Sequence, residues 1–247
     1  MLVIGRNPVI EALKFNPKSI KKLVLLESVS NNKLKEIIKI AQQKNIIIEK
    51  FPKIRFEKLL DRKDKSEGIS QGIIAEVEEF KYSKTSEILK SVEGNEQITL
   101  AVLDEIQDPH NFGAIIRSAA ASGIVGIIIS DKNTVKVNHT VIKTSSGATN
   151  YIKISKESNI YTAVEYLKEK GFKIIGTVLN ADKNLYEFSF PGKCVIIFGN
   201  EGEGLRKNLI KLCDYLIKIP LAGKIESLNV SVTAGVIFYE ILRQRNY

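Results

Sequence analysis

The sequence predicts an α/β protein in which a small α/β domain precedes a larger domain built on a parallel sheet. Short apolar runs alternate with stretches of helical periodicity along the chain, which is typical of this fold class. The later runs are continuously apolar, as in parallel strands that helices cover on both faces. The stretch Lys81–Gln97 is polar and lacks an apolar period at its start. We therefore predict domains at residues 1–79 and 98–247, joined by a linker at residues 80–97.

In the first domain, three predicted strands alternate with helices. Asn7 can cap a helix that has Pro8 at its first position and ends near Phe15. The strand candidates are Lys22–Leu26, Ile46–Glu49 and Gln71–Val77. Helical spacing of apolar residues between them predicts one amphipathic helix with Leu34, Ile37, Ile38 and Ala41, and a shorter one with Phe56, Leu59 and Leu60.

The rest of the chain repeats the alternation at larger scale. A short helix is expected at Thr85–Ser91 within the linker. The predicted strands that follow are Ile98–Leu103, Val125–Ser130, Lys173–Leu179, Lys193–Phe198 and Tyr215–Ile219. After the first of them, a helix carries an apolar stripe of Phe112, Ile115, Ile116, Ala119 and Ala120, and it ends at Ala121-Ser122-Gly123. The last helix begins near Asn229, with a predicted apolar face of Val232, Val236, Tyr239, Ile241 and Leu242.

The charge distribution favours a polyanionic partner. The net charge is +9, and residues 1–80 hold 16 Lys and Arg against 11 Asp and Glu. A lysine-rich surface can also serve solubility alone, so the charge by itself puts nucleic acid only somewhat ahead. The candidate phosphate contacts in this basic domain are Arg6, Lys53, Arg55, Lys58, Arg62 and Lys63.

Several classes of protein are disfavoured. The two cysteines form no CxxC, and His110 and His139 have no companions at metal-ligand spacing, so we expect no metal site. No run of about 18 apolar residues and no secretory signal is present, which predicts a cytoplasmic protein without a membrane partner.

A glycine cluster follows one of the buried strands. Cys194–Phe198 is apolar, and Gly199, Gly202 and Gly204 follow it, so a ligand can approach the backbone there. The order GxxGxG differs from the GxGxxG of dinucleotide sites, and acidic residues between the glycines disfavour phosphate. Such a loop suits a cationic or hydroxyl-rich ligand, although an isolated cluster of this kind is more often an ordinary strand-to-helix turn.

A second turn lies ahead of the last helix. Pro220 ends a strand, and Ser227 and Asn229 are both good N-cap residues. Taken alone, Asn229 would be interpreted as a helix cap.

Together with Leu103–Ala119, these two segments resemble the three motifs of the SpoU/TrmH family of SPOUT RNA 2'-O-ribose methyltransferases. The first motif contains Asn111 and, six residues later, Arg117. The resemblance covers residues 97–247, and the region before it resembles the ribosomal-protein-like RNA-binding domain that some members carry. It implies a deep C-terminal trefoil knot, a homodimer packed at the knot, and methyl transfer from S-adenosylmethionine to a ribose 2'-hydroxyl in RNA.

The resemblance also assigns site residues. Asn111, Arg117, Glu201 and Asn229 match the polar residues that the family places around the reacting centre. The implied cofactor contacts are Thr177, Val178, Leu179, Gly199, Asn200, Gly202, Ile219, Leu221, Leu228 and Ser231. A guanidinium stays protonated in proteins, so we expect Arg117 to act electrostatically on the nucleotide rather than as a base.

The substrate is less closely specified. The two-domain layout most resembles enzymes that methylate a guanosine ribose of large-subunit (23S) ribosomal RNA, with transfer RNA as the alternative. Ser70-Gln71-Gly72 stands where related front domains often show His-Gln-Gly, which weakens inference about RNA contacts there. Two further readings are an RNA-binding or ribosome-assembly factor without activity, and an oxidoreductase that uses the glycine loop.

Overall fold

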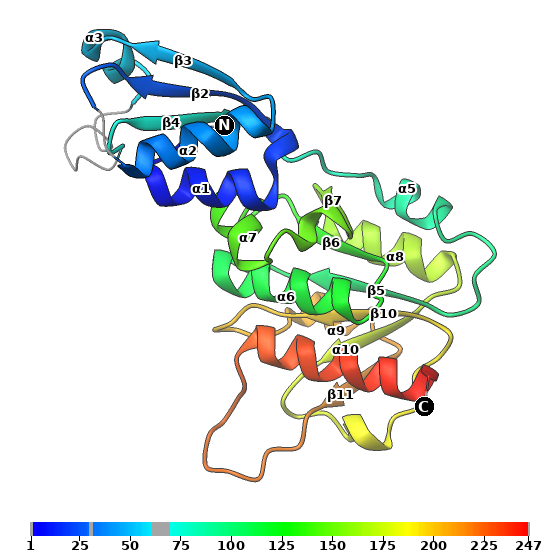
Figure 1. The fold of residues 1–247 in the computed structure, drawn as a ribbon. Helices are drawn as coiled ribbons and strands as arrows, with labels where there is room; N and C mark the ends of the chain where they lie inside the picture. Colours follow the sequence, from blue (N-terminus) through cyan, green and yellow to red (C-terminus); the bar gives the residue numbers. More distant parts are fainter. Residues whose placement is uncertain (1, 30–31, 61–69, 247) are drawn as a thin grey trace. The chain divides into compact units, whose positions relative to one another are not determined.

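The chain folds into two compact units in the computed structural model, which describes residues 2–29, 32–60 and 70–246. The units comprise residues 1–81 and 82–247 (Figure 1). Each is an α/β unit with its own sheet and its own core. The predicted fold class is confirmed.

The front unit is built on a four-stranded sheet in the order β1-β4-β2-β3. Strands β2 and β3 are parallel, and β4 runs antiparallel to both β1 and β2. Buried side chains of α1 and α2 cover one face of the sheet, and Phe56 of α3 packs on the other with Val24 and Ile74. Its elements are β1 (Leu2–Ile4), α1 (Arg6–Phe15), a 3-10 turn (Pro17–Ser19), β2 (Ile20–Leu26), α2 (Asn32–Gln43), β3 (Ile47–Phe51), α3 (Lys53–Glu57) and β4 (Ile73–Val77).

Two local predictions for this unit are wrong. Helix α1 begins at Arg6 instead of being capped by Asn7, because Gly5 occupies the N-cap position with a φ of 96°. Helix α3 ends at Glu57, so Leu59 and Leu60 lie in the turn that follows. Leu60 is nevertheless buried beside Phe56, which explains why its spacing resembled a helix.

The second unit is built on a seven-stranded sheet in which every pair is parallel. The strand order is β7-β6-β5-β10-β8-β11-β9, so β10 lies between two strands that precede it in the chain. The strands are β5 (Ile98–Leu103), β6 (Gly126–Ser130), β7 (Lys153–Glu157), β8 (Lys173–Thr177), β9 (Lys183–Asn184), β10 (Lys193–Phe198) and β11 (Tyr215–Lys218). The helices are α5 (Thr85–Lys90), α6 (Pro109–Ala121), α7 (His139–Thr144), α8 (Ile160–Glu169), α9 (Lys207–Ile210) and α10 (Val230–Asn246), with 3-10 turns at Ala148–Asn150 and Leu185–Glu187.

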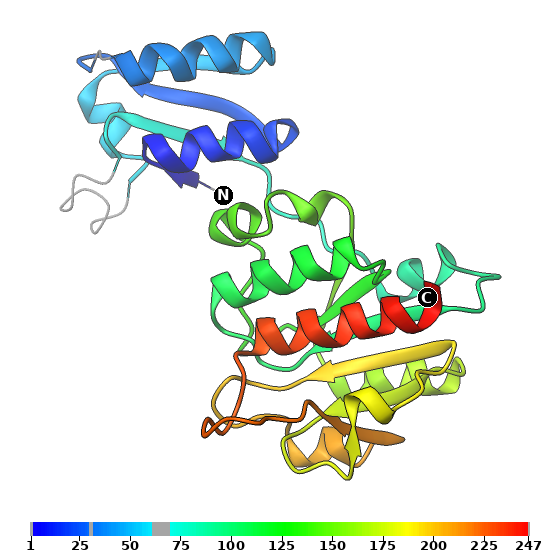
Figure 2. The same cartoon turned by 60° about the horizontal axis from the view of Figure 1, so that its bottom comes forward.

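Helices cover both faces of this sheet. On one face, α6 and α10 lie side by side in both views (Figures 1 and 2), and the Phe198 ring of β10 packs edge-on against Phe238 of α10 at 5.4 Å. On the other face, Val195 and Ile197 of the same strand join the core formed with α5, α8 and α9. This alternation explains why β10 is apolar from Cys194 to Phe198.

The segment expected to be a linker packs largely on the second unit. Ile88 of α5 is fully buried in its core, and Thr85 shares a hydrogen bond of 2.9 Å with Ser155 of β7. Thr85, Ile88 and Val92 of this stretch are buried, and Leu89 packs against the same core.

The sequence analysis also missed three edge strands, β1 of the front unit and β7 and β9 of the second, and it misplaced one helix face. Strand β7 mixes lysine and glutamate with its apolar residues, and β9 is two residues long. Helix α10 buries Ala234, Ile237, Phe238 and Ile241, whereas Val232 and Tyr239 remain 49% and 52% exposed. The trefoil knot stays a prediction.

Candidate functional site

A cavity of about 720 Å³ opens where β8, β10 and β11 end. The carboxyl ends of parallel strands meet at one edge of a sheet, and ligand sites of α/β proteins gather there. Four chain segments form the wall: the residues after β8, the glycine loop after β10, the end of β11 with the turn that follows, and the start of α10. The lining residues are Thr177–Asn180, Phe198–Leu205, Ile210, Leu216–Ile219, Leu221, Ser227–Val230, Thr233 and Ile237.

The glycine loop is a closed, hydrogen-bonded turn. Asn200 and Gly204 exchange two backbone hydrogen bonds of 3.0 Å, and the Asn200 side-chain oxygen accepts from the Gly202 amide at 2.8 Å. A Cβ at Gly199 would lie 2.2 Å from the carbonyl carbon of Gly204 and 2.3 Å from the Leu205 nitrogen. The turn therefore closes this tightly only because residue 199 is glycine.

Three of the four predicted catalytic residues form one hydrogen-bonded chain at the cavity. The Asn229 amide donates to Asn111 Oδ1 at 2.9 Å, and the Asn111 amide donates to Glu201 Oε1 at 3.1 Å. Asn229 Oδ1 in turn accepts from the backbone and hydroxyl of Ser231 at 2.8 and 2.6 Å. Residues from α6, the glycine loop and the start of α10 thus hold one another in fixed orientation.

Arg117 lies apart from this chain. Asn111 sits in the first turn of α6, because Asp108 caps the helix by accepting from the His110 amide at 2.7 Å. Six residues along a helix rotate a side chain by about 120° away from its starting direction. Arg117 is accordingly exposed, does not line the cavity, and has no hydrogen-bond or ion-pair partner within the described residues.

The predicted cofactor contacts mostly lie on the cavity. Nine of the ten line it: Thr177, Val178, Leu179, Gly199, Asn200, Gly202, Ile219, Leu221 and Leu228. Ser231 does not, because its hydroxyl turns to Asn229 within the first turn of α10. Missed wall residues include Asn180, Ile210, Thr233 and Ile237, which carry no motif signal and reach the cavity through tertiary packing.

An ion-pair cluster lies beneath the glycine loop. Arg206, which follows the loop directly, donates from Nε to Asp104 Oδ2 at 2.9 Å, from Nη2 to Asp104 Oδ1, and from Nη1 to Glu105 Oε1 at 3.0 Å. Asp104 is fully buried; burial raises the pKa of its carboxyl, and the hydrogen bonds from Arg206 oppose that rise. The sequence analysis did not single out this cluster, since its members lie about 100 residues apart.

The candidate RNA contacts of the front unit gather at one end of its sheet. Arg6 follows β1 and donates from Nε to the Gln71 carbonyl at 3.1 Å, ahead of β4. Lys53 and Arg55 follow β3 on α3, and the Arg55 guanidinium lies 3.8 Å from the centre of the Phe51 ring. Lys58 follows α3 and is exposed. Arg62 and Lys63 lie outside the described residues.

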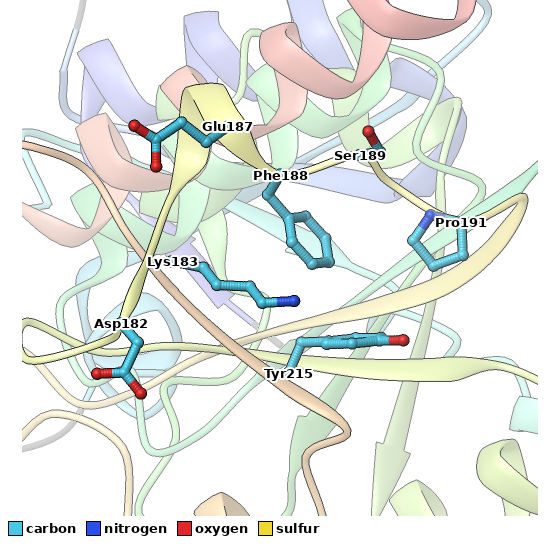
Figure 3. Close-up of a pocket in the computed structure, with 7 residues that line it drawn as sticks. All are labelled: Asp182, Lys183, Glu187, Phe188, Ser189, Pro191 and Tyr215. Atoms are coloured by element: carbon cyan, nitrogen blue, oxygen red, sulfur yellow. The ribbon is translucent and has the colours of Figure 1, made fainter.

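A second hollow, of about 390 Å³, lies at the β9 edge of the larger sheet. Figure 3 shows the Lys183 side chain between the rings of Phe188 and Tyr215, whose centres lie 5.6 and 4.9 Å from the ammonium nitrogen. The Lys183 ammonium therefore lies against both aromatic rings, where a cationic ligand would otherwise bind. None of the motif residues lines this hollow, so we assign no ligand to it.

Within the described residues, no group of three or more His, Cys, Asp or Glu side chains could hold a metal ion. No described helix combines the length and apolar character that crossing a bilayer requires.

Comparison with known proteins gives matches over both units. The SpoU rRNA Methylase family matches residues 98–239, and the RNA 2'-O ribose methyltransferase substrate binding family matches residues 2–83. The putative TrmH family tRNA/rRNA methyltransferase YacO of Bacillus subtilis (strain 168) is 35% identical over 245 residues, which cover 99% of this chain and 96% of that protein.

Two solved structures share the fold. The AdoMet-bound rRNA methyltransferase from Sinorhizobium meliloti matches 98% of this chain and 86% of its own, with a TM-score of 0.67 and 24% identity. The TrmH/SpoU tRNA modifying enzyme of A. aeolicus matches 65% of this chain and 81% of its own, with a TM-score of 0.55 and 29% identity.

Proposed function

Because the chain belongs to the SpoU family of RNA methyltransferases, we propose that it methylates the ribose 2'-hydroxyl of a guanosine in large-subunit (23S) ribosomal RNA. The methyl donor is S-adenosylmethionine. The hydrogen-bonded chain of Asn111, Glu201 and Asn229 at the cavity carries the proposal, because it joins residues of all three motifs at one place.

The cavity suits this cofactor. Its volume of about 720 Å³ lies within the range of pockets that hold small molecules. The glycine loop lines the cavity, and a side chain at Gly199 would force the loop open by colliding with the backbone of Gly204 and Leu205. We assign cofactor binding to the backbone at Gly199, Ile219 and Leu228, with Thr177–Leu179 beside them. When bound, the cofactor supplies an electrophilic methyl group on a sulfonium sulfur.

The chain's own residues then position the ribose. The Asn111 amide is engaged through both its oxygen and its nitrogen, so its plane is fixed before substrate arrives. We assign Glu201 and Asn229 to hold the ribose and the two loops, so that the 2'-oxygen lies in line with the methyl group. Such positioning accelerates transfer because the orientation is fixed before the reaction.

We assign the fourth catalytic group to a second copy of the chain. Arg117 is rotated away from Asn111 on α6, and the neighbouring helix α10 exposes Val232 and Tyr239 at helical spacing on the same face of the unit. A homodimer packed through this face would cover the apolar side chains and bring Arg117 of the partner subunit to the reacting centre. There the guanidinium orients the nucleotide and stabilises charge developing on the 2'-oxygen.

Mixing two inactive variants tests the shared site. In a dimer, Arg117→Ala paired with Asn229→Ala leaves one of two sites intact, so a fully exchanged equimolar mixture should recover about a quarter of wild-type activity. A mixture that stays as inactive as the separate variants would place Arg117 and Asn229 in the same subunit's site. Full activity of Arg117→Ala measured alone would show that Arg117 is dispensable.

A competition experiment tests the substrate. We expect label from S-adenosylmethionine to enter 23S ribosomal RNA transcripts and to appear as 2'-O-methylguanosine. The front unit, which matches the substrate binding family and has exposed cations at one end of its sheet, supports RNA as the substrate, and the description of the matched methylase family names ribosomal RNA. Label that enters transfer RNA instead would keep the reaction and replace the substrate.

A further inference from the structure

We propose that Arg206 is a positioning residue for the cofactor, acting as a clamp that holds the glycine loop, residues 199–205, against Asp104 and Glu105. This inference rests on the proposed function of that loop as the cofactor site. Arg206 does not line the cavity, so it acts only through the residues that do.

The guanidinium bridges two segments that are far apart in sequence. Its three donors reach both carboxylate oxygens of Asp104 and one oxygen of Glu105; Nε lies 2.9 Å from Asp104 Oδ2, and Nη1 lies 3.0 Å from Glu105 Oε1. Asp104 directly follows β5, and its backbone amide donates to the carbonyl of Phe198, the last residue of β10, at 2.9 Å. The clamp therefore ties the end of the loop to the same place at which the loop begins.

A second contact holds the other side of the loop to the same two residues. The side-chain amide of Asn200 donates to the Glu105 carbonyl at 2.9 Å. Glu105 adopts a positive φ of 58°, which turns this carbonyl out of the strand direction. Its side chain is fixed further by the Asn133 amide at 3.2 Å. Both ends of the cofactor loop are thus anchored on residues 104 and 105, which lead into the helix that carries Asn111.

Removing the clamp would leave a fully buried carboxylate without its main partner. Asp104 is 0% exposed, whereas the Arg206 side chain is 32% exposed and reaches solvent. An unpaired charge at Asp104 would draw water inward or move the strand end, and either change displaces the loop. Leu205, buried in the core beside Arg206, would shift with it.

The geometry requires arginine rather than a generic cation. A lysine ammonium is a compact charge and cannot present the planar fork that spans two oxygens of Asp104 while reaching Glu105. The guanidinium also lies 5.1 Å from the centre of the Tyr161 ring, which limits its movement on the side of α8. Arg206→Lys therefore keeps the charge and removes the clamp geometry.

The test compares Arg206→Lys with a matched control, Arg243→Lys. Arg243 also makes two donor contacts, at 2.9 and 2.8 Å, to a carboxylate that is 7% exposed, but it does so on the last helix away from the cavity. Calorimetry gives the Kd for S-adenosylmethionine, and steady-state kinetics separate its KM from kcat. We expect the Kd and KM of Arg206→Lys to rise at least about tenfold, which corresponds to about 1.4 kcal/mol, with kcat at saturating cofactor changed less than about threefold. Arg243→Lys should bind the cofactor as the wild type does.

A merely structural role would lower the melting temperature and the titrated fraction of active enzyme but leave the KM of the remaining enzyme unchanged, and that result would overturn the clamp. An unchanged Kd in Arg206→Lys would overturn it as well. If the wild type itself failed to bind S-adenosylmethionine, the proposed function would fail first, so the two failures are distinguishable.

Discussion

Replacing Gly199 with alanine perturbs the cofactor loop at its tightest point. An added Cβ would meet the Gly204 carbonyl carbon at 2.2 Å, the Leu205 nitrogen at 2.3 Å and the Gly204 oxygen at 2.4 Å. All of these atoms are backbone, so no flexible side chain can move aside. The loop must open by about 1 Å to restore ordinary van der Waals separation.

The free-energy cost of Gly199→Ala follows from the contacts that the loop loses when it opens. Overpacking of a closed site costs about 1–3 kcal/mol. The two 3.0 Å hydrogen bonds between Asn200 and Gly204 would be lost with it, and each contributes about 1 kcal/mol net. A cofactor that requires the closed loop must overcome the overpacking strain of about 1–3 kcal/mol to reclose it, so the Kd should rise by about 5- to 150-fold.

Calorimetric titration with S-adenosylmethionine measures this loss, and Gly204→Ala in the same loop is the control. Gly204 has a φ of 70° but no atom within 4 Å of an added Cβ, so alanine there meets only backbone strain of about 1–2 kcal/mol. Gly199→Ala should therefore bind the cofactor clearly more weakly than Gly204→Ala. Equal affinities, or wild-type affinity in Gly199→Ala, would refute the role assigned to the closed loop.

Three further predictions concern separate parts of the second unit. Asn229→Asp keeps an oxygen that can accept from the Ser231 amide but loses the nitrogen that donates to Asn111. We therefore expect kcat to fall at least about tenfold while the melting temperature stays near that of the wild type. An unchanged kcat would contradict this role. Hydrogen bonds from Arg243 hold the pKa of Glu240 below its ordinary value of 4.5, so this carboxylate stabilises the fold above about pH 4.5 and that contribution is lost as pH falls through the native pKa. The free energy of unfolding of Glu240→Gln, measured with urea, should therefore fall less than that of the wild type when the pH is lowered from about 6 to about 3. An equal fall in both proteins would contradict the ion pair between Glu240 and Arg243. Burial raises the pKa of Cys213 to about 12, so iodoacetamide at about pH 8 should label this thiol only in denaturant, and rapid labelling of the native protein would show the packing to be wrong.

Local patterns predicted the elements that build the core of the second unit. The bounds of β5 and β10 match the predicted strands residue for residue, because every residue of the two strands except Lys193 is buried. The edge strands β7 and β9 were not predicted, since a strand with only one neighbouring strand tolerates charged residues and can be short. In α10 the sequence offered more than one apolar stripe, and only packing against α6 decided that Ile237 and Phe238 turn inward.

The candidate site was predictable to the extent that motifs identify it. Asn111, Glu201 and Asn229 lie as far as 118 residues apart, so their convergence came from family resemblance and not from spacing. Helical geometry indicates from the sequence that Arg117 points away from Asn111, since a residue six positions later cannot share its direction once Asn111 lies inside the helix. The ion-pair cluster of Arg206 left no trace in local sequence, because a carboxylate after one strand and an arginine after another meet only in the folded sheet.

Transfer of a labelled methyl group from S-adenosylmethionine to RNA that lacks the modification tests the central claim most directly, with nucleoside analysis of the product and Arg117→Ala measured beside the wild type. We predict label in a 2'-O-methylnucleoside with the wild type and none above background with the variant. Label on a base instead of a ribose, or no transfer to any RNA despite tight cofactor binding, would contradict the account.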